Sequence, residues 1–167
     1  LGPASEVQAE LMGIPSFETP DYSELFAEEK EMIGKLKKAF LMVAGGAVQK
    51  YGPDLDGHQQ LLMAAADILI EIYMAESTIL RTEKLAKTKG EAAVKEQIAM
   101  AQLYLYKAVD IITQKGKEGI VSFAEGDEQR MMLMGLRRYT KYTNMPNVIG
   151  LREIITSKLV AENAYCF

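Results

Sequence analysis

The chain has 167 residues, of which 49% are hydrophobic, so it can build one well-formed core and a single domain is the default expectation. Its formal net charge of -4 gives no broad positive field for a phosphate backbone, and we therefore expect no nucleic-acid partner. The single cysteine, Cys166, excludes an internal disulfide and a thiolate zinc site. It fits either a reducing compartment or indifference to redox state, and we expect a cytoplasmic protein.

Residues 1–22 form an extended N-terminal lead-in in our interpretation. Residues 4–12 have the composition of a short helix, but Gly13, Pro15 and Pro20 interrupt it. The segment has neither the basic region nor the apolar core of a signal peptide. The lack of an initiator Met suggests an excised fragment, and a processed chain would look the same. The longest apolar run, residues 39–48, is shorter than the roughly 20 residues that span a bilayer, so no membrane span is expected.

The helical domain is expected over residues 23–167, and its first helix over residues 23–50. Asp21 and Glu24 have the spacing of a capping pair, and apolar residues then recur at helical intervals. The recurring residues are Leu25, Met32, Leu36, Phe40, Val43 and Ala47. Pro53 cannot continue the hydrogen-bond ladder, so the first helix must end before it.

The second helix is predicted to be the longest, and Gly90 ends it. Asp56 and Gln59 again have capping-box spacing at its start. Its apolar face is Leu61, Ala65, Ile68, Ile72, Ile79 and Leu80. In the third helix the apolar residues step alternately by four and three, the spacing of a seam packed against near-parallel neighbours. They are Val94, Ile98, Ala101, Leu105, Ala108 and Ile112.

An irregular link is expected from Lys115 to Asp127, because Gly116, Gly119 and Gly126 interrupt or flank it. Residues 120–124 are the only strand-like run in the sequence, and a single strand has no partner to pair with. We therefore predict that this link is the most mobile surface segment of the domain.

Two further helices complete the expected domain. Asp127 is expected to cap the fourth, which ends before Pro146, and Asn147 to cap the fifth. Their apolar residues are Met131, Leu133, Met134 and Leu136 in the fourth and Leu151, Ile154, Ile155 and Leu159 in the fifth. Short connections between long helices place sequential neighbours antiparallel, so the expected fold class is all-α, an up-and-down helical bundle of about five helices.

The residues supply no complete catalytic or metal-binding constellation. His58 is the only histidine, whereas a di-iron bundle needs Glu-x-x-His pairs on two helices, and we interpret it as a surface or capping-region residue. Asp54 and Asp56 lack the remainder of a calcium loop, and Cys166 has no second histidine to activate it. Gly46 lies inside a helical pattern, where close helix crossing explains it better than a phosphate-binding loop. We therefore expect no catalytic, cofactor-binding or metal site in this chain.

Two groups of charged residues are candidates for a binding or structural role. Glu76 and Glu83 lie seven residues apart on a face with apolar residues, and charges there need partners. With Arg81 they are our candidates for a structural charge network. The basic cluster consists of Arg137, Arg138 and Lys141. We interpret it as a source of partners for these glutamates or for a neighbouring domain, as a solvated surface, or as a contact for a phosphate group.

Three segments in this order resemble the C-terminal extension of acyl-CoA dehydrogenases, most closely in the very-long-chain branch. They are residues 44–49 (AGGAVQ), 66–68 (ADI) and 75–84 (AESTILRTEK), and the resemblance covers residues 39–167. In that family an upstream core holds the flavin and the acyl-CoA, and the extension packs against this core in a homodimer. The family's catalytic glutamate also lies in the core, followed by a Gly-Thr/Ser-Asn motif that this sequence lacks.

The resemblance implies a non-catalytic helical domain of an FAD-dependent acyl-CoA dehydrogenase of fatty-acid β-oxidation. Its implied partner is the catalytic core of the same parent chain, in a homo-oligomer, and FAD belongs to that parent, not to this chain. Mitochondrial members use the extension at membranes, but this acidic sequence has no strongly basic amphipathic helix, so membrane contact is not expected. The alternative is a free-standing helical adaptor for a protein or amphipathic peptide, favoured by the Met-rich run 131–134 and the basic cluster.

Overall fold

The computed structural model describes Gly2, Glu6, Val7 and residues 22–166. Across 22–166 it contains five α-helices, two short 3₁₀ turns and no strand. The elements are α2 (Ala27–Tyr51), η1 (Gly52–Gly57), α3 (Gln59–Lys89), η2 (Glu91–Val94), α4 (Lys95–Phe123), α5 (Gly126–Tyr139) and α6 (Val148–Glu162). The all-α prediction is confirmed. The helix expected over residues 4–12 lies mostly outside the described residues, as does the Asp21 cap.

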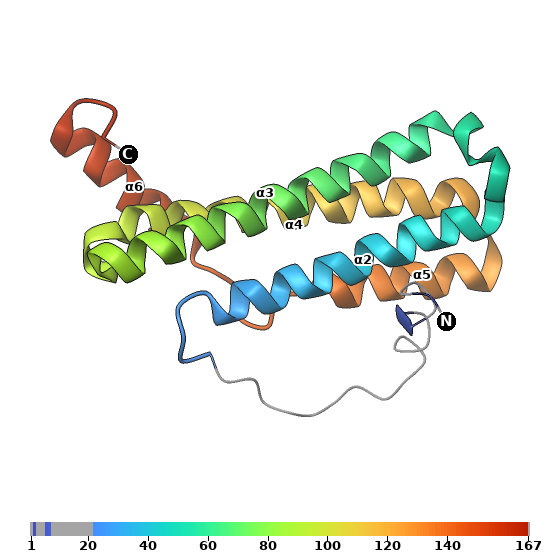
Figure 1. Cartoon of the computed structure of the whole chain (residues 1–167), viewed down its shortest axis with the longest axis horizontal. Helices are drawn as coiled ribbons and strands as arrows, with labels where there is room; N and C mark the ends of the chain where they lie inside the picture. The colour runs from blue at the N-terminus through green and yellow to red at the C-terminus, as the bar shows by residue number, and fades with distance from the viewer. Residues whose placement is uncertain (1, 3–5, 8–21, 167) are drawn as a thin grey trace.

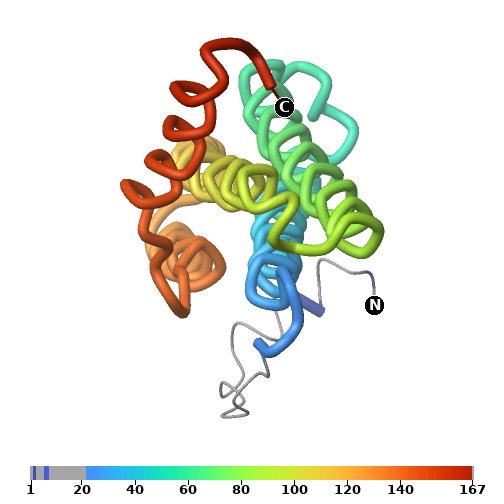
Figure 2. The backbone as a smooth tube through the Cα atoms, turned by 90° about the vertical axis from the view of Figure 1, so that its left-hand side faces the viewer, coloured from blue at the N-terminus to red at the C-terminus, as the bar shows by residue number. Residues whose placement is uncertain are grey.

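The bundle is built around α2 and α4, which pack against each other and against both α3 and α5. Helices α2, α3, α4 and α5 run in alternating directions along the long axis, so the up-and-down topology is confirmed (Figure 1). Figure 2 shows α3 and α5 on opposite sides of the α2–α4 pair. The last helix, α6, packs against α4 and projects from one end of the bundle (Figure 1).

The core forms where the predicted apolar faces of α2, α3 and α4 meet. Its fully buried side chains include Met32, Leu36, Val43, Ile68, Ile79, Leu105 and Ile112. Burying a large apolar side chain contributes roughly 1.5–3 kcal/mol, so these faces supply most of what holds the three helices together. Leu80 departs from the prediction, because half of its surface is exposed on the outer side of α3.

The predicted link between Lys115 and Asp127 is wrong. Helix α4 continues to Phe123, with Ile120 and Phe123 buried, and only residues 124–125 connect it to α5. Gly116 is buried inside the helix, and a Cβ atom on it would lie 2.8 Å from Leu136 Cδ1. The glycines of α4 therefore permit close helix crossing, the role expected for Gly46, and do not break the helix.

The helix starts agree with the predictions in one case of three. The Asn147 side chain accepts a hydrogen bond from the Gly150 amide at 3.1 Å, which confirms the predicted cap of α6. Asp56 does not cap α3, because it lies in η1 and the cap position belongs to His58. Asp127 does not cap α5 but lies within its first turn, where its negative charge interacts favourably with the positive end of the helix dipole.

In the two shorter helices Leu136 is buried as predicted, but most of the other predicted apolar residues are not. In α5 the buried residues are Met132, Gly135, Leu136 and Tyr139, whereas Met131 and Met134 are exposed. A run of four apolar residues has no helical period, so it does not reveal which of its residues face the core. In α6 no residue is buried.

Candidate functional site

The glutamates Glu76 and Glu83 join α3 to α2 through two lysines. Lys37 Nζ lies 2.6 Å from Glu76 Oε1, and Lys30 Nζ lies 2.9 Å from Glu83 Oε2. Lys87 Nζ lies 2.9 Å from the other oxygen of Glu83. Hydrogen bonds from Lys30 and then Lys87 hold the pKa of the Glu83 carboxyl below its usual value. The two contacts to Glu83 stabilise its carboxylate form. Both glutamates therefore take part in ion pairs that join α3 to α2.

Reasoning from the sequence missed Lys30 and Lys37, although a signal was present. The two lysines lie seven residues apart, as Glu76 and Glu83 do, so antiparallel α2 and α3 bring the two pairs together in matching register. Arg81 does not join them, because it is exposed and makes no ion pair with any described residue. Partly exposed ion pairs contribute about 0–1 kcal/mol each, so their main effect is on register.

The basic cluster of Arg137, Arg138 and Lys141 lies at the C-terminal end of α5. All three residues are exposed, and none forms an ion pair within the described part of the chain. The two arginines occupy the last turn of the helix, where their positive charges interact favourably with the negative end of the helix dipole. The suggestion that this cluster supplies the partners of Glu76 and Glu83 is wrong, since the lysines of α2 do so.

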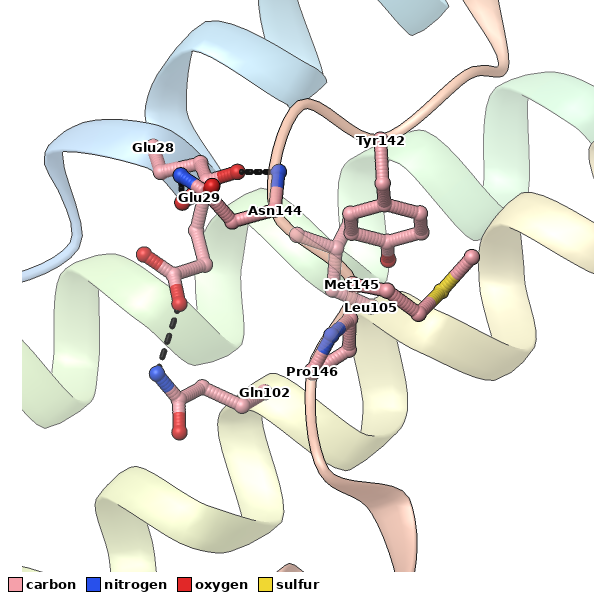
Figure 3. A pocket seen from close by; sticks show the side chains of 8 residues that line it. All are labelled: Glu28, Glu29, Gln102, Leu105, Tyr142, Asn144, Met145 and Pro146. Atoms are coloured by element: carbon pink, nitrogen blue, oxygen red, sulfur yellow. Dashed lines mark hydrogen bonds between the residues drawn. The ribbon is translucent and has the colours of Figure 1, made fainter.

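A small pocket of about 150 Å³ lies where the connection between α5 and α6 crosses α2 and α4 (Figure 3). Its lining residues are Glu28, Glu29, Gln102, Leu105, Tyr142, Asn144, Met145 and Pro146. The backbone amide of Asn144 donates to Glu28 Oε1 at 2.7 Å, and its side-chain amide donates to Glu28 Oε2 at 3.1 Å. Gln102 Nε2 donates to Glu29 Oε1 at 2.6 Å. The Asn144 bonds hold the connection against α2, and the Gln102 bond joins α4 to α2 beneath it.

Tyr142 is the most unusual residue of this pocket. Its hydroxyl is buried and has no hydrogen-bond partner within residues 22–166, and its ring stacks on Tyr106 with centroids 6.2 Å apart. Burial, followed by the nearby charge of Glu29, raises the pKa of the Tyr142 hydroxyl. The phenol therefore stays protonated at neutral pH and cannot act as a base there.

The remaining candidate residues lie in ordinary structural surroundings. His58 stacks on Tyr51 with ring centroids 3.5 Å apart, and Cys166 is a half-buried free thiol. Within the described residues no group of three or more potential ligands could hold a metal ion. Over the same residues, no helix has the length and apolar character needed to cross a bilayer.

Comparisons with known proteins agree on one family. The family described as acyl-CoA dehydrogenase, C-terminal domain, matches residues 35–138. The chain is 36% identical over 159 residues to a probable acyl-CoA dehydrogenase of Bacillus subtilis (strain 168), and the match covers 95% of this chain and 26% of that protein.

Its fold is similar to a crystal structure of an acyl-CoA dehydrogenase complexed with FAD from Bacillus anthracis. The TM-score is 0.89 with 37% sequence identity, and the match covers 98% of this chain and 27% of the other. The chain thus spans about a quarter of the length of these relatives. From the matched residues and the shared fold together, the chain belongs to the acyl-CoA dehydrogenase C-terminal domain family.

Proposed function

We propose that this chain is a non-catalytic helical domain of a longer, FAD-dependent acyl-CoA dehydrogenase of fatty-acid β-oxidation. In this proposal the domain packs against the catalytic core of the same polypeptide and supports assembly of a homo-oligomer. The observation that carries the proposal is the match of nearly the whole chain to about a quarter of two acyl-CoA dehydrogenases. A cytoplasmic location is part of the proposal and rests on the single cysteine.

Two acidic hollows of the described structure fit FAD poorly, which supports assigning the flavin to the remainder of the parent. The pocket of about 150 Å³ is smaller than the roughly 300 Å³ at which ligand pockets begin. Two glutamates line it, and their charge would repel the pyrophosphate of FAD. A surface hollow of about 360 Å³ lies beside Glu24, Glu83 and Glu91, and its carboxylates would repel the pyrophosphate in the same way.

The glutamates of α3 also suit a non-catalytic domain. Dehydrogenation of an acyl-CoA needs a base that takes a proton from the carbon next to the thioester. Glu83 is a poor candidate, because two lysines lower the pKa of its carboxyl. Glu76 is engaged in an ion pair with Lys37, at 2.6 Å. The base would therefore come from the part of the parent that this chain does not include.

The basic cluster is proposed as a contact for the parent enzyme. Arg137, Arg138 and Lys141 are exposed and unpaired among the described residues, so they can meet carboxylates or a phosphate group of a neighbouring domain. Charge reversal of all three in the longer enzyme should weaken this contact and lower its melting temperature more in low salt than in high salt. An unchanged melting temperature at both salt concentrations would show that the cluster does not contribute to the interface.

Flavin binding and turnover test the proposed function directly. The 167-residue chain alone should show no flavin absorbance after incubation with FAD and should dehydrogenate no acyl-CoA. A longer polypeptide that contains it should do both. FAD-dependent turnover by this chain alone would overturn the proposal.

The alternative function is a free-standing helical adaptor, which the exposed side chains of Met131 and Met134 favour, because methionines repack readily around a partner. The genomic sequence immediately upstream of Leu1 separates the two candidates. An in-frame dehydrogenase core supports the enzyme domain, whereas a start codon at that point supports the adaptor.

A further inference from the structure

Helix α3 carries a second apolar face on the side turned away from the bundle. Ile72, Ile79 and their neighbours along the inner face are buried in the core. On the outer face, Ile70 is 56% exposed and Tyr73 is 68% exposed. The outer patch, as we name it, consists of seven large exposed side chains: Leu62, Met63, Leu69, Ile70, Tyr73, Met74 and Leu80.

The charged residues of this part of α3 all avoid the outer patch. Between Leu61 and Leu80 they are Asp67, Glu71 and Glu76, and each is tied to a neighbouring helix. Asp67 pairs with Lys115, Glu71 accepts from the Tyr104 hydroxyl and Glu76 pairs with Lys37. No charged residue interrupts the patch, so its apolar side chains form a continuous surface. A free protein surface normally shows such side chains singly and scattered.

The spacing of the outer patch fits a helix as its partner. Small and large residues follow one another along its centre at steps of four and three, the seam of helices that pack nearly parallel or antiparallel. The seam is Leu62, Ala66, Leu69, Tyr73, Ser77 and Leu80. The small residues Ala66 and Ser77 allow a second helix to approach closely. A helix that is apolar on two opposite faces is normally buried on both.

Beyond Leu80 the outer face of α3 becomes basic, which marks the limit of the apolar contact. Arg81 and Lys84 are exposed there and make no ion pair with any described residue. A helix docked on the outer patch would therefore place carboxylates opposite these two cations. The patch and its basic border together specify an apolar helix with an acidic end.

We infer that the outer patch of α3 is the surface on which an apolar helix from the remainder of the longer polypeptide docks. The inference rests on the proposed function. The relatives have nearly four times the length of this chain, so most of their polypeptide lies outside the matched part and can supply a helix to the outer patch. The outer patch gathers seven large exposed apolar side chains on α3, and its seam runs along about five turns of that helix.

Cysteine labelling tests the docking surface at Tyr73. In a background carrying Cys166→Ser, Tyr73→Cys is placed both in the 167-residue chain and in the longer polypeptide, and reaction with a maleimide is followed by mass spectrometry. The cysteine should react fast in the 167-residue chain, where position 73 is exposed, and at least about tenfold more slowly in the longer polypeptide. Lys117→Cys is the matched control.

Lys117 suits this control because it is exposed on α4 and lies two residues beyond Lys115, which faces α3. Two residues along a helix turn the side chain to roughly the opposite side, so position 117 should react at similar rates in both proteins. Equal rates at position 73 in the two proteins would overturn the inference. Slow reaction at position 73 in the 167-residue chain would also overturn it, and a dimer seen by light scattering would then identify a second copy as the occupant.

Flavin content separates failure of this inference from failure of the proposed function. A longer polypeptide that binds FAD and oxidises acyl-CoA, but labels fast at position 73, contradicts only the docking surface. A longer polypeptide without flavin or activity contradicts the proposed function, and the inference falls with it. A second variant, Ile70→Glu, should lower the melting temperature of the longer polypeptide while leaving that of the 167-residue chain unchanged.

Discussion

Gly46 shows how little space remains where α2 crosses α4 and α5. A Cβ atom there would lie 2.9 Å from Met132 Cε and 2.9 Å from Phe123 Cε2, and both side chains are buried. We expect Gly46→Ala to lower the free energy of unfolding by about 1–2 kcal/mol, because overpacking outweighs the better helix propensity of alanine. Urea unfolding followed by circular dichroism measures the change.

Gly34 provides the control on the same helix. It is exposed, and a Cβ atom added to it meets nothing within 4 Å. Gly34→Ala should therefore raise the free energy of unfolding by about 0.5–1 kcal/mol through helix propensity alone. Equal effects of the two substitutions would show that the crossing at Gly46 has room to relax.

The Tyr142 hydroxyl is expected to destabilise the protein slightly. It is buried without a hydrogen-bond partner in the described structure, so the chain loses solvation of the hydroxyl on folding and gains no bond in return. Tyr142→Phe should keep the ring stacked on Tyr106 and raise the free energy of unfolding by up to about 1 kcal/mol. A loss of more than that in thermal unfolding would mean that the hydroxyl has a partner after all.

Single residues were the hardest to predict from the sequence. Asn147 was predictable, because the side chain that caps a helix lies next to the amide that it accepts from. The partner of Glu76 was not, because Lys37 lies 39 residues away and only the packing of two helices brings them together. Tyr142 gave no signal at all, since burial of its hydroxyl depends on the path of the connection after α5.

Helix α3 offers a direct comparison of its two apolar faces. Ile72 is 2% exposed and Ile70 is 56% exposed, although they are two residues apart. Ile72→Asp should destabilise the 167-residue chain by about 3 kcal/mol or more, because an unpaired carboxylate would enter the core. Ile70→Asp should change the free energy of unfolding by less than about 0.5 kcal/mol. Chemical denaturation of the two variants beside the parent chain compares them.

The contact between α2 and α3 should depend on pH through Glu83. Its folded pKa lies below the ordinary value of 4.5, so its contribution to stability is present above that value and is lost as the pH falls through the folded pKa. Glu83→Gln should therefore be less stable than the parent chain at pH 7, and the difference should vanish at low pH. Melting temperatures measured from pH 7 to pH 3 test this.

Glu153→Gln is a suitable control for this series, because Glu153 is exposed on α6 and makes no ion pair with a described residue. It should track the parent chain at every pH. If Glu83→Gln also tracks the parent chain, the two lysines do not stabilise the Glu83 carboxylate in solution.

At the level of elements, apolar spacing predicted the buried helix faces well, whereas glycine residues were unreliable markers of helix ends. The faces of α2, α3 and α4 follow from apolar spacing, and Gly90 marks the end of α3 as expected. The link predicted around Gly116 was wrong, because one sequence does not distinguish a glycine that breaks a helix from one that lets two helices approach. The partner Leu136 is what distinguishes them, and the sequence alone does not show it.

For the whole molecule, the bundle could be predicted because long amphipathic segments with short connections have few ways to pack. The surfaces could not be predicted in the same way. The sequence of α3 shows apolar residues on nearly all sides, and only the structure shows that one side is covered and the other open. The family relationship, by contrast, was visible in the order of three helical segments and is now shown by the match to residues 35–138.

The position of α4 has a consequence for how the bundle opens. It contacts α2, α3, α5 and α6, so none of these helices can lose its packing without exposing part of α4. Its central amides should therefore exchange with deuterium only when the whole domain unfolds, whereas α6, which buries no residue, should exchange through local opening. The domain would then behave as one cooperative unit with a loosely attached final helix.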